Sequence, residues 1–111
     1  MNTCAKGNRI EREFDQWVKS LGYITNRAIR SQFNRNDIWG CFDVMAKHPK
    51  APDKTLYFQI STQWKYGKAR IEIESFPRGL FDMVFMVRRK DRGSFEFRHL
   101  TDDGWIPQED F

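Results

Sequence analysis

Two polar residues in neighbouring predicted strands could bind a divalent cation together. Asp43 falls in a strand predicted over 41–46, and Gln59 falls in a strand predicted over 56–62. If these strands form a hairpin, alternate residues share a face, so the two side chains can converge across it. Carboxylate, amide and carbonyl oxygens are the ligands that Mg²⁺ prefers in proteins. We therefore expect a metal site centred on this pair.

A third ligand can come from the first predicted helix. Glu11 lies at the margin of the apolar stripe of this helix, beside Val18, where a side chain can reach around the core into a cleft. Glu13 lies at the opposite margin, so the placement favours Glu11 over Glu13. Glutamates on a helix surface are common and need no function, so the argument rests on the three residues as a set.

Hydrophobic periodicity and turn signals predict the elements that would position these residues. Apolar residues at helical spacing predict a helix over 8–21, which Gly22 ends. The segment 63–76 fits both a helix and a strand, and we favour a helix that ends at Pro77. The other predicted elements are strands over 23–29, 41–46, 56–62, 83–89 and 95–100, a polar loop over 31–36, and connections over 48–54 and 91–93.

This order, α-β-β-β-α-β followed by one more strand, predicts an α/β fold with a mixed sheet flanked by helices. The first three strands would form a meander, and the second helix would make a right-handed crossover to the next strand. A chain of 111 residues is short for two domains, so we expect a single domain over 1–111.

The charge balance favours a polyanionic partner. Lys and Arg outnumber Asp and Glu by 19 to 15, which gives a formal net charge of +4. Cys4 and Cys41 stand in no Cys/His ligand spacing, so we expect neither a disulfide framework nor a zinc site. Because no apolar run is long enough to span a membrane and no signal-peptide core is present, we expect a cytoplasmic protein that does not associate with membranes.

Several short motifs, taken in order, resemble one nuclease superfamily. The chain contains Lys6-Gly7-x-Arg9-x-Glu11-Arg12-Glu13, then Gly22-Tyr23, Asp43-Val44 and Phe58-Gln59-Ile60-Ser61. In order and spacing, this series resembles the archaeal Holliday-junction resolvase branch of the PD-(D/E)XK superfamily. The run Arg35-x-Asp37-Ile38-Trp39-Gly40-x-x-Asp43, followed by Gln59-x-Ser61-Thr62, resembles small phage-borne nuclease-like proteins of the same superfamily. Each motif is degenerate, so the resemblance rests on their combination.

The resemblance implies a restriction-endonuclease-like αβββαβ core. It also implies a divalent-metal-dependent endonuclease that hydrolyses DNA phosphodiester bonds, with branched DNA as one candidate substrate. Mg²⁺ would be the cofactor and Mn²⁺ a substitute for it. The metal-binding residues would be Glu11, Asp43, Gln59 and Ile60, and the first three of these would also be catalytic. We expect so small an enzyme to act on two strands as a homodimer.

One position departs from the superfamily pattern in a way that affects catalysis. Gln59-x-Ser61 stands in the place of Glu-x-Lys, so Ser61 cannot supply the cation that orients the attacking water and stabilises the phosphate. Lys68 is the best substitute and completes the predicted catalytic set, because it would lie one turn into the second helix. Arg70 and Lys65 are alternatives, and all three could equally be solvated charges on a helix.

The residues expected to contact DNA are Lys6, Arg9, Arg35, Lys65, Arg70, Arg88, Arg89 and Lys90. Asp37 is either a loop cap or a second acid at the mouth of the cleft. Two other functions remain open. A nuclease-like fold that lost its lysine would act only as a DNA-binding or protein-interaction module. Alternatively, the C-terminal half, with Phe95, Phe97 and Arg98, would form a binding surface unrelated to cleavage.

Overall fold

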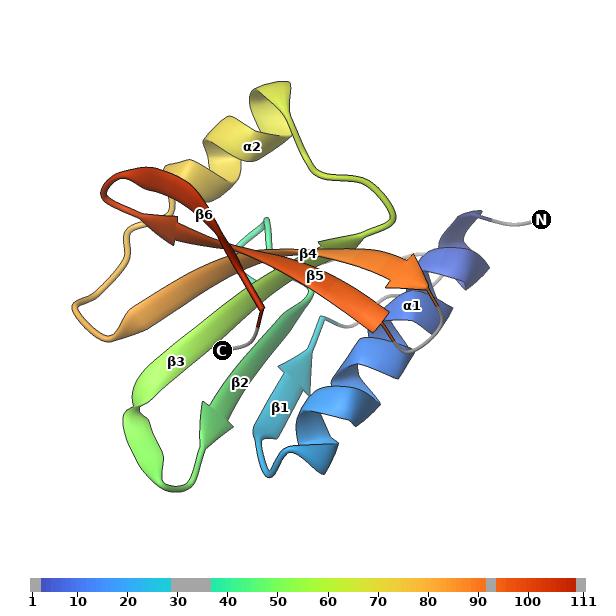
Figure 1. Cartoon of the computed structure of the whole chain (residues 1–111), viewed down its shortest axis with the longest axis horizontal. Coiled ribbons are helices and arrows are strands. Elements are labelled where there is room, and N and C mark those ends of the chain that lie inside the picture. Colours follow the sequence, from blue (N-terminus) through green and yellow to red (C-terminus); the bar gives the residue numbers. More distant parts are fainter. Residues whose placement is uncertain (1–2, 29–36, 92–93, 110–111) are drawn as a thin grey trace.

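The computed structural model describes residues 3–28, 37–91 and 94–109, with side chains from Arg9 onward in these ranges. Over these residues the chain forms two helices and six strands (Figure 1). The elements are α1 (Thr3–Ser20), β1 (Ile24–Arg27), β2 (Val44–His48), β3 (Ala51–Ser61), α2 (Gly67–Glu74), β4 (Asp82–Asp91), β5 (Ser94–Thr101) and β6 (Gly104–Gln108).

All of these strands join one mixed sheet in the order β1-β2-β3-β4-β5-β6. Strands β1, β2 and β3 form an antiparallel meander. Strand β4 runs parallel to β3 because α2 lies in the connection between them, and β5 and β6 then continue antiparallel. The α/β class, the mixed sheet and the initial meander expected from the sequence are therefore confirmed.

Helix α1 covers one face of the sheet through its apolar stripe. Ile10, Phe14 and Val18 repeat every four residues and are all buried. The Phe14 ring lies at the centre of this contact, with its centroid 4.8 Å from that of Phe58 and 5.2 Å from that of Phe95. The sheet residues of this core are Val44, Ala46, Leu56, Phe58, Ile60, Phe85, Val87 and Phe97.

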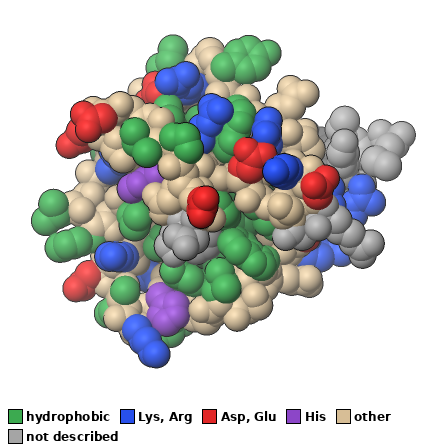
Figure 2. All heavy atoms as spheres, viewed as in Figure 1, with side chains coloured by type: hydrophobic (Ala, Val, Ile, Leu, Met, Phe, Trp, Pro, Cys, Tyr) green, Lys and Arg blue, Asp and Glu red, His purple; other side chains and the backbone are tan. Residues whose placement is uncertain are grey.

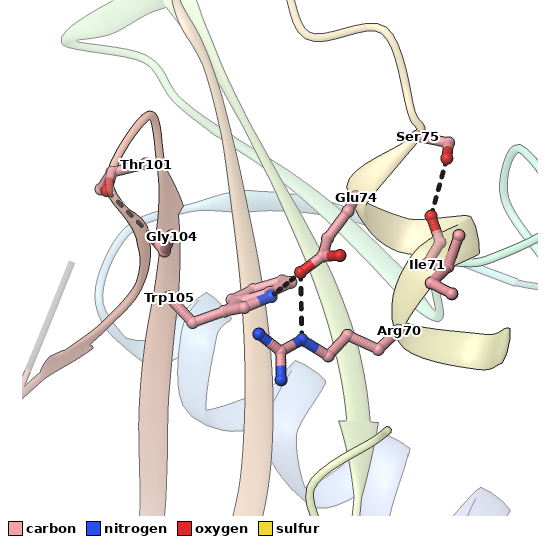
Figure 3. A network of polar contacts seen from close by, with 7 residues as sticks. All are labelled: Arg70, Ile71, Glu74, Ser75, Thr101, Gly104 and Trp105. Carbon is pink, nitrogen blue, oxygen red and sulfur yellow. Dashed lines mark hydrogen bonds and ion pairs between the residues drawn. The ribbon is translucent and has the colours of Figure 1, made fainter. Parts of the chain in front are cut away.

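Helix α2 lies over the opposite face, so the sheet runs between the two helices (Figure 1). Ile73 is the buried residue of this helix, and it packs in a second core with Phe42, Tyr57, Val84, Met86 and Leu100. A polar contact ties the same helix to β6 (Figure 3). The indole Nε1 of Trp105 donates to Oε2 of Glu74 at 2.7 Å, and the Arg70 Nε donates to the same oxygen at 3.0 Å.

The structure differs from the sequence expectation in the hairpin between β2 and β3 and at one edge of the sheet. The hairpin connection is only Pro49–Lys50, because β3 already begins at Ala51. Strand β6 was not expected, since a run of five residues that contains Pro107 gives a weak strand signal. Pairing with β5 supplies the backbone hydrogen bonds that stabilise β6 although its own residues favour a strand only weakly. The loop predicted over 31–36 lies outside the described residues.

The surface shows both signs of charge. On the face drawn in Figure 2, Lys and Arg side chains are interspersed with Asp and Glu side chains. The net charge of +4 is thus not gathered into one patch on that face, and contacts with a polyanion must be argued residue by residue. No helix among the described residues is long and apolar enough to cross a membrane.

Candidate active site

A cavity of about 260 Å³ lies where α1, the segment before β2, the end of β3 and α2 meet. Its lining includes all four residues that the sequence predicted as metal-binding: Glu11, Asp43, Gln59 and Ile60. The fold thus brings together polar groups from three segments that are far apart in the chain. The rest of the lining consists of Asp37, Gly40, Cys41, Lys65, Ala69, Glu72 and Ile73.

Asp43 is held in place by backbone groups of two strands. Its N–H donates to the carbonyl oxygen of Phe58 at 2.8 Å, and its own carbonyl accepts from the N–H of Ala28 at 2.8 Å. Its carboxylate Oδ2 accepts from the N–H of Ile60 at 2.7 Å. A hydrogen bond to a charged acceptor is stronger than a neutral one. The carboxylate therefore has a defined position beside the end of β3.

A tight turn over 38–42 delivers Asp43 to this position. Ile38 and Phe42 exchange two main-chain hydrogen bonds, at 2.8 and 2.9 Å. Within the turn, Gly40 has φ 76° and Trp39 has φ 55°, and the left-handed conformation costs energy for a residue with a Cβ. The sequence placed the start of the strand at Cys41. The turn instead moves the start of β2 to Val44.

Gln59 and Ile60 present different groups to the cavity. The Gln59 side chain is buried on the α2 face of β3, and its Nε2 donates to the carbonyl oxygen of Ile60 at 3.3 Å. The Ile60 side chain packs in the α1 core, so only its backbone can serve as a ligand. To share a cation with that carbonyl, the Gln59 amide must turn its Oε1 toward the cavity instead of its Nε2.

Glu11 reaches the cavity from α1 and is as buried as Asp43, each with 5% of its surface exposed. It follows the core residue Ile10 on the helix, at the edge of the apolar stripe. Glu13 lies elsewhere, since its Oε2 pairs with Nε of Arg89 at 3.1 Å. Of the two glutamates considered as ligands, Glu11 therefore lines the cavity and Glu13 does not.

The cavity has a negative electrostatic character. The pKa of the Cys41 thiol is raised to about 11, first by burial and then by the carboxylates of Asp37, Glu72 and Asp43. Within the described ranges, no group of three or more His, Cys, Asp and Glu side chains could hold a metal ion by itself. A cation here would need amide, carbonyl and water oxygens besides the carboxylates, which is how Mg²⁺ is commonly held. The donor set fits such a hard cation.

Lys65, rather than Lys68, is the lysine that lines the cavity. Lys68 lies in the first turn of α2 and is exposed, and the structure does not bring it to the predicted ligands. Arg70 is held by Glu74 on the side of α2 that meets β6, as Figure 3 shows. Of the three cations considered as replacements for the missing lysine, Lys65 is the one that lines the cavity.

The other basic residues expected to contact DNA are dispersed. Arg88 pairs with Glu96 at 2.6 Å, and Arg89 points to the opposite face, where it pairs with Glu13. Arg9 and Lys90 are exposed. The Lys6 side chain and the whole of Arg35 lie outside what the structure describes.

The sequence interpretation did not name Glu72 among the residues of the site, and it placed Lys65 behind Lys68 as a substitute for the missing lysine. Glu72 directly precedes Ile73, the buried residue of α2, and Ala69 lies one turn before Ile73; all three line the cavity. Lys65 comes before the extended N-cap residue Tyr66, so it lies in the connection between β3 and α2 and not on the helix. The apolar Ile73 was the signal that could have found Glu72, whereas no periodic pattern indicates Lys65.

Comparison of the chain with family models, curated proteins and solved structures found no match.

Proposed function

We propose that this protein is a Mg²⁺-dependent endonuclease that hydrolyses DNA phosphodiester bonds and is built on a PD-(D/E)XK nuclease-like core. One observation carries the proposal: Glu11, Asp43, Gln59 and Ile60, chosen from sequence motifs alone, line a single cavity. The element order α1-β1-β2-β3-α2-β4 supports it, since it is the αβββαβ order that the resemblance implies.

The residues of the cavity would have different roles in such a reaction. Asp43, Glu11, Gln59 and the carbonyl of Ile60 would hold the cation. When bound, the cation would activate water and offset charge on the phosphate. Asp43 stays aligned because the N–H of Ile60 holds its carboxylate at 2.7 Å. Lys65, which also lines the cavity, would offer positive charge to the phosphate as negative charge develops on it.

Asp43→Asn tests this assignment. The variant keeps the side-chain shape and loses one anionic ligand, so we expect cleavage of labelled branched, duplex or single-stranded DNA in Mg²⁺ or Mn²⁺ to be abolished, as it is by EDTA in the wild type. Asp53→Asn is the matched control, because Asp53 is an exposed residue at the far end of β3. Equal cleavage by Asp43→Asn and Asp53→Asn would refute the proposed site.

A second candidate function is a nuclease-like module that binds DNA without cutting it. Ser61 favours this alternative, because its hydroxyl donates to the backbone carbonyl of Gln63 and it carries no charge. If the wild type is inert with both metal ions and Ser61→Lys creates metal-dependent cleavage, the binding module is the correct function. Cleavage by the wild type that Lys65→Ala removes would favour the enzyme.

A further inference from the structure

An aromatic and basic cluster lies directly beside the candidate active site. It consists of Trp64, Lys65, Tyr66, Arg88 and Arg98, which we call the Trp64 platform. The guanidinium carbon of Arg98 lies 4.1 Å from the centroid of the Trp64 ring, and that of Arg88 lies 5.3 Å from it. Cations at this distance from an indole are held by its negative face. The ring therefore positions both guanidinium groups.

The sheet sets the spacing of the two arginines. Arg88 of β4 stands opposite Glu96 of β5, and Arg98 stands opposite Met86, so both side chains project from the α2 face of the sheet. Arg88 is partly neutralised by its 2.6 Å contact with Glu96. Arg98 forms no ion pair among the described residues and acts on Glu96 only at longer range, because Glu96 pairs with Arg88, so Arg98 can bind an anion.

A groove of about 360 Å³ connects this platform to the cavity. It is lined by the chain from Ser61 to Tyr66 and by Ala69. Lys65 and Ala69 line both the groove and the candidate active site, so the two spaces adjoin. Tyr66, at the other side of the groove, exposes 80% of its surface although it is aromatic. A ring this exposed contributes little to the core of the described chain.

We propose that this groove binds an unpaired DNA strand and leads it into the cavity, which makes the substrate a DNA that carries single-stranded nucleotides beside the scissile bond. Positive groups that follow a strand, combined with aromatic rings on which bases stack, are the chemistry of single-strand binding. Bases inside a duplex have no free face to offer Tyr66, so stacking there requires an unpaired base. Arg98 and Lys65 would contact the phosphates between stacked bases.

This inference rests on the proposed function, because it assigns a route for the substrate of that site. Binding measured in EDTA tests this inference separately from the proposed function, because DNA cannot be cleaved without the metal ion. The probe is a fluorescent oligothymidine, and its affinity is measured by anisotropy for the wild type, Tyr66→Ala, Arg98→Gln and the control Lys54→Ala. Lys54 is exposed on β3 at the end far from the platform. Tyr66 is so exposed that its replacement leaves folding intact.

We expect Tyr66→Ala to weaken binding about tenfold, the scale of one lost stacked base. Arg98→Gln should weaken it and lower the salt slope of log K by about 0.7, the value for one phosphate contact of a single strand. Lys54→Ala should bind like the wild type. Undiminished affinity in both platform variants would overturn the proposal, as would equal affinity for blunt duplex DNA or equal competition by polyglutamate. Loss of cleavage in Asp43→Asn with binding unchanged would support both proposals.

Discussion

At the scale of single residues, the position of Asp43 shows how a backbone defines a site. Its carboxylate is aligned by the N–H of Ile60, and its main chain is bonded to Phe58 and Ala28. A ligand held by main-chain groups keeps its position when neighbouring side chains move. Cation affinity at this site would then depend on Glu11, which lines the cavity from α1, and on Gln59 of β3, whose amide must turn its Oε1 toward the cavity.

The choice between Lys65 and Lys68 can be tested directly. Lys65→Ala should lower the rate of metal-dependent cleavage by about 10²–10³, the usual effect of removing one group that stabilises developing charge. Lys68→Ala should leave the rate near that of the wild type, because Lys68 does not line the cavity. Single-turnover rates at saturating DNA are the measurement. A large loss in Lys68→Ala alone would restore the assignment made from the sequence.

The reactivity of the Cys41 thiol reports the burial and negative charge of the cavity without an activity assay. Because its pKa is raised to about 11, the reactive thiolate is scarce near neutral pH. In a Cys4→Ser background, iodoacetamide should modify Cys41 slowly at about pH 8, and the rate should rise with pH until about pH 11. Glu72→Gln removes one of the carboxylates that raise this pKa, so it should speed modification. A rate that levels off near pH 9 would contradict the assigned environment.

The same shift has a consequence for stability. The folded chain keeps the thiol proton at pH values where the unfolded chain, with the ordinary pKa of 9.0, has lost it. Between these two values the folded state binds more protons, so its stability falls as pH rises from about 9 toward about 11. Below about pH 9 the thiol is protonated in both the folded and the unfolded chain, so it does not make the stability depend on pH.

At the scale of elements, α1 has both a structural and a chemical role. Its apolar stripe fixes the helix on the sheet through Ile10, Phe14 and Val18, and that docking carries Glu11 to the cavity. Helix α2 has the corresponding role on the other face, where Ile73 is its buried anchor and Glu72 lines the cavity. Lys65 lines the cavity from the connection that precedes this helix. The tie from Glu74 to Trp105 adds a polar contact between α2 and β6.

Removing the central ring of the α1 contact should loosen the whole fold. Phe14→Ala leaves a cavity between α1 and the sheet, so we expect the free energy of unfolding to fall by about 3–5 kcal/mol in urea titrations. Phe14→Leu, which fills part of the space, should cost less. Phe81→Ala is the matched control, because Phe81 is exposed and its loss should change stability little. Equal stability of the Phe14 and Phe81 variants would contradict the packing of α1.

At the scale of the whole molecule, the positive charge is spread over both faces of the sheet. Arg88 and Lys90 alternate with Arg89 along β4, so Arg89 points to the α1 face, where Glu13 pairs with it. The three consecutive basic residues, which look like one cluster in the sequence, therefore do not form one DNA-binding surface. Lys65 lines the cavity, and Arg88 and Arg98, which project from the α2 face, lie over the ring of the neighbouring Trp64.

The salt dependence of DNA affinity should distinguish the basic residues that contact phosphates from those that do not. Affinity for duplex DNA should fall with salt, with a slope in log K of about −0.9 for each phosphate contacted. Arg88→Gln should make the slope shallower because Arg88 projects from the α2 face, whereas Arg89→Gln should leave it unchanged because that side chain lies on the α1 face beside Glu13. Affinity that does not respond to salt would exclude a phosphate-binding role for the whole molecule.

We propose that the active form is a homodimer, since the described chain has one candidate active site and a duplex has two strands. Light scattering on the eluting protein should then give a mass near twice the 13.3 kDa of one chain at concentrations that cut both strands. Cutting of both strands by a species with the mass of one chain would exclude the dimer.

The sequence alone determined the α/β class, the order of elements up to β5 and the candidate ligands, because these depend on local periodicity and on residue types that suit Mg²⁺. Ile10, Phe14 and Val18 predict their helix whatever it packs against, and the run of apolar and aromatic residues around Phe58 predicts its strand.

Only the tertiary structure decided three features. Lys65 lines the cavity together with the candidate metal ligands, β2 begins at Val44, and residues Gly104–Gln108 form a sixth strand. The preference for Lys68 assumed a helix that starts directly after β3, whereas α2 starts only at Gly67, and Lys65 lines the cavity from the extended connection before it. The turn over 38–42 depends on left-handed φ values at Trp39 and Gly40, which a tryptophan does not signal. Strand β6 forms because β5 offers it hydrogen-bond partners, and such pairing between segments is invisible in a local window.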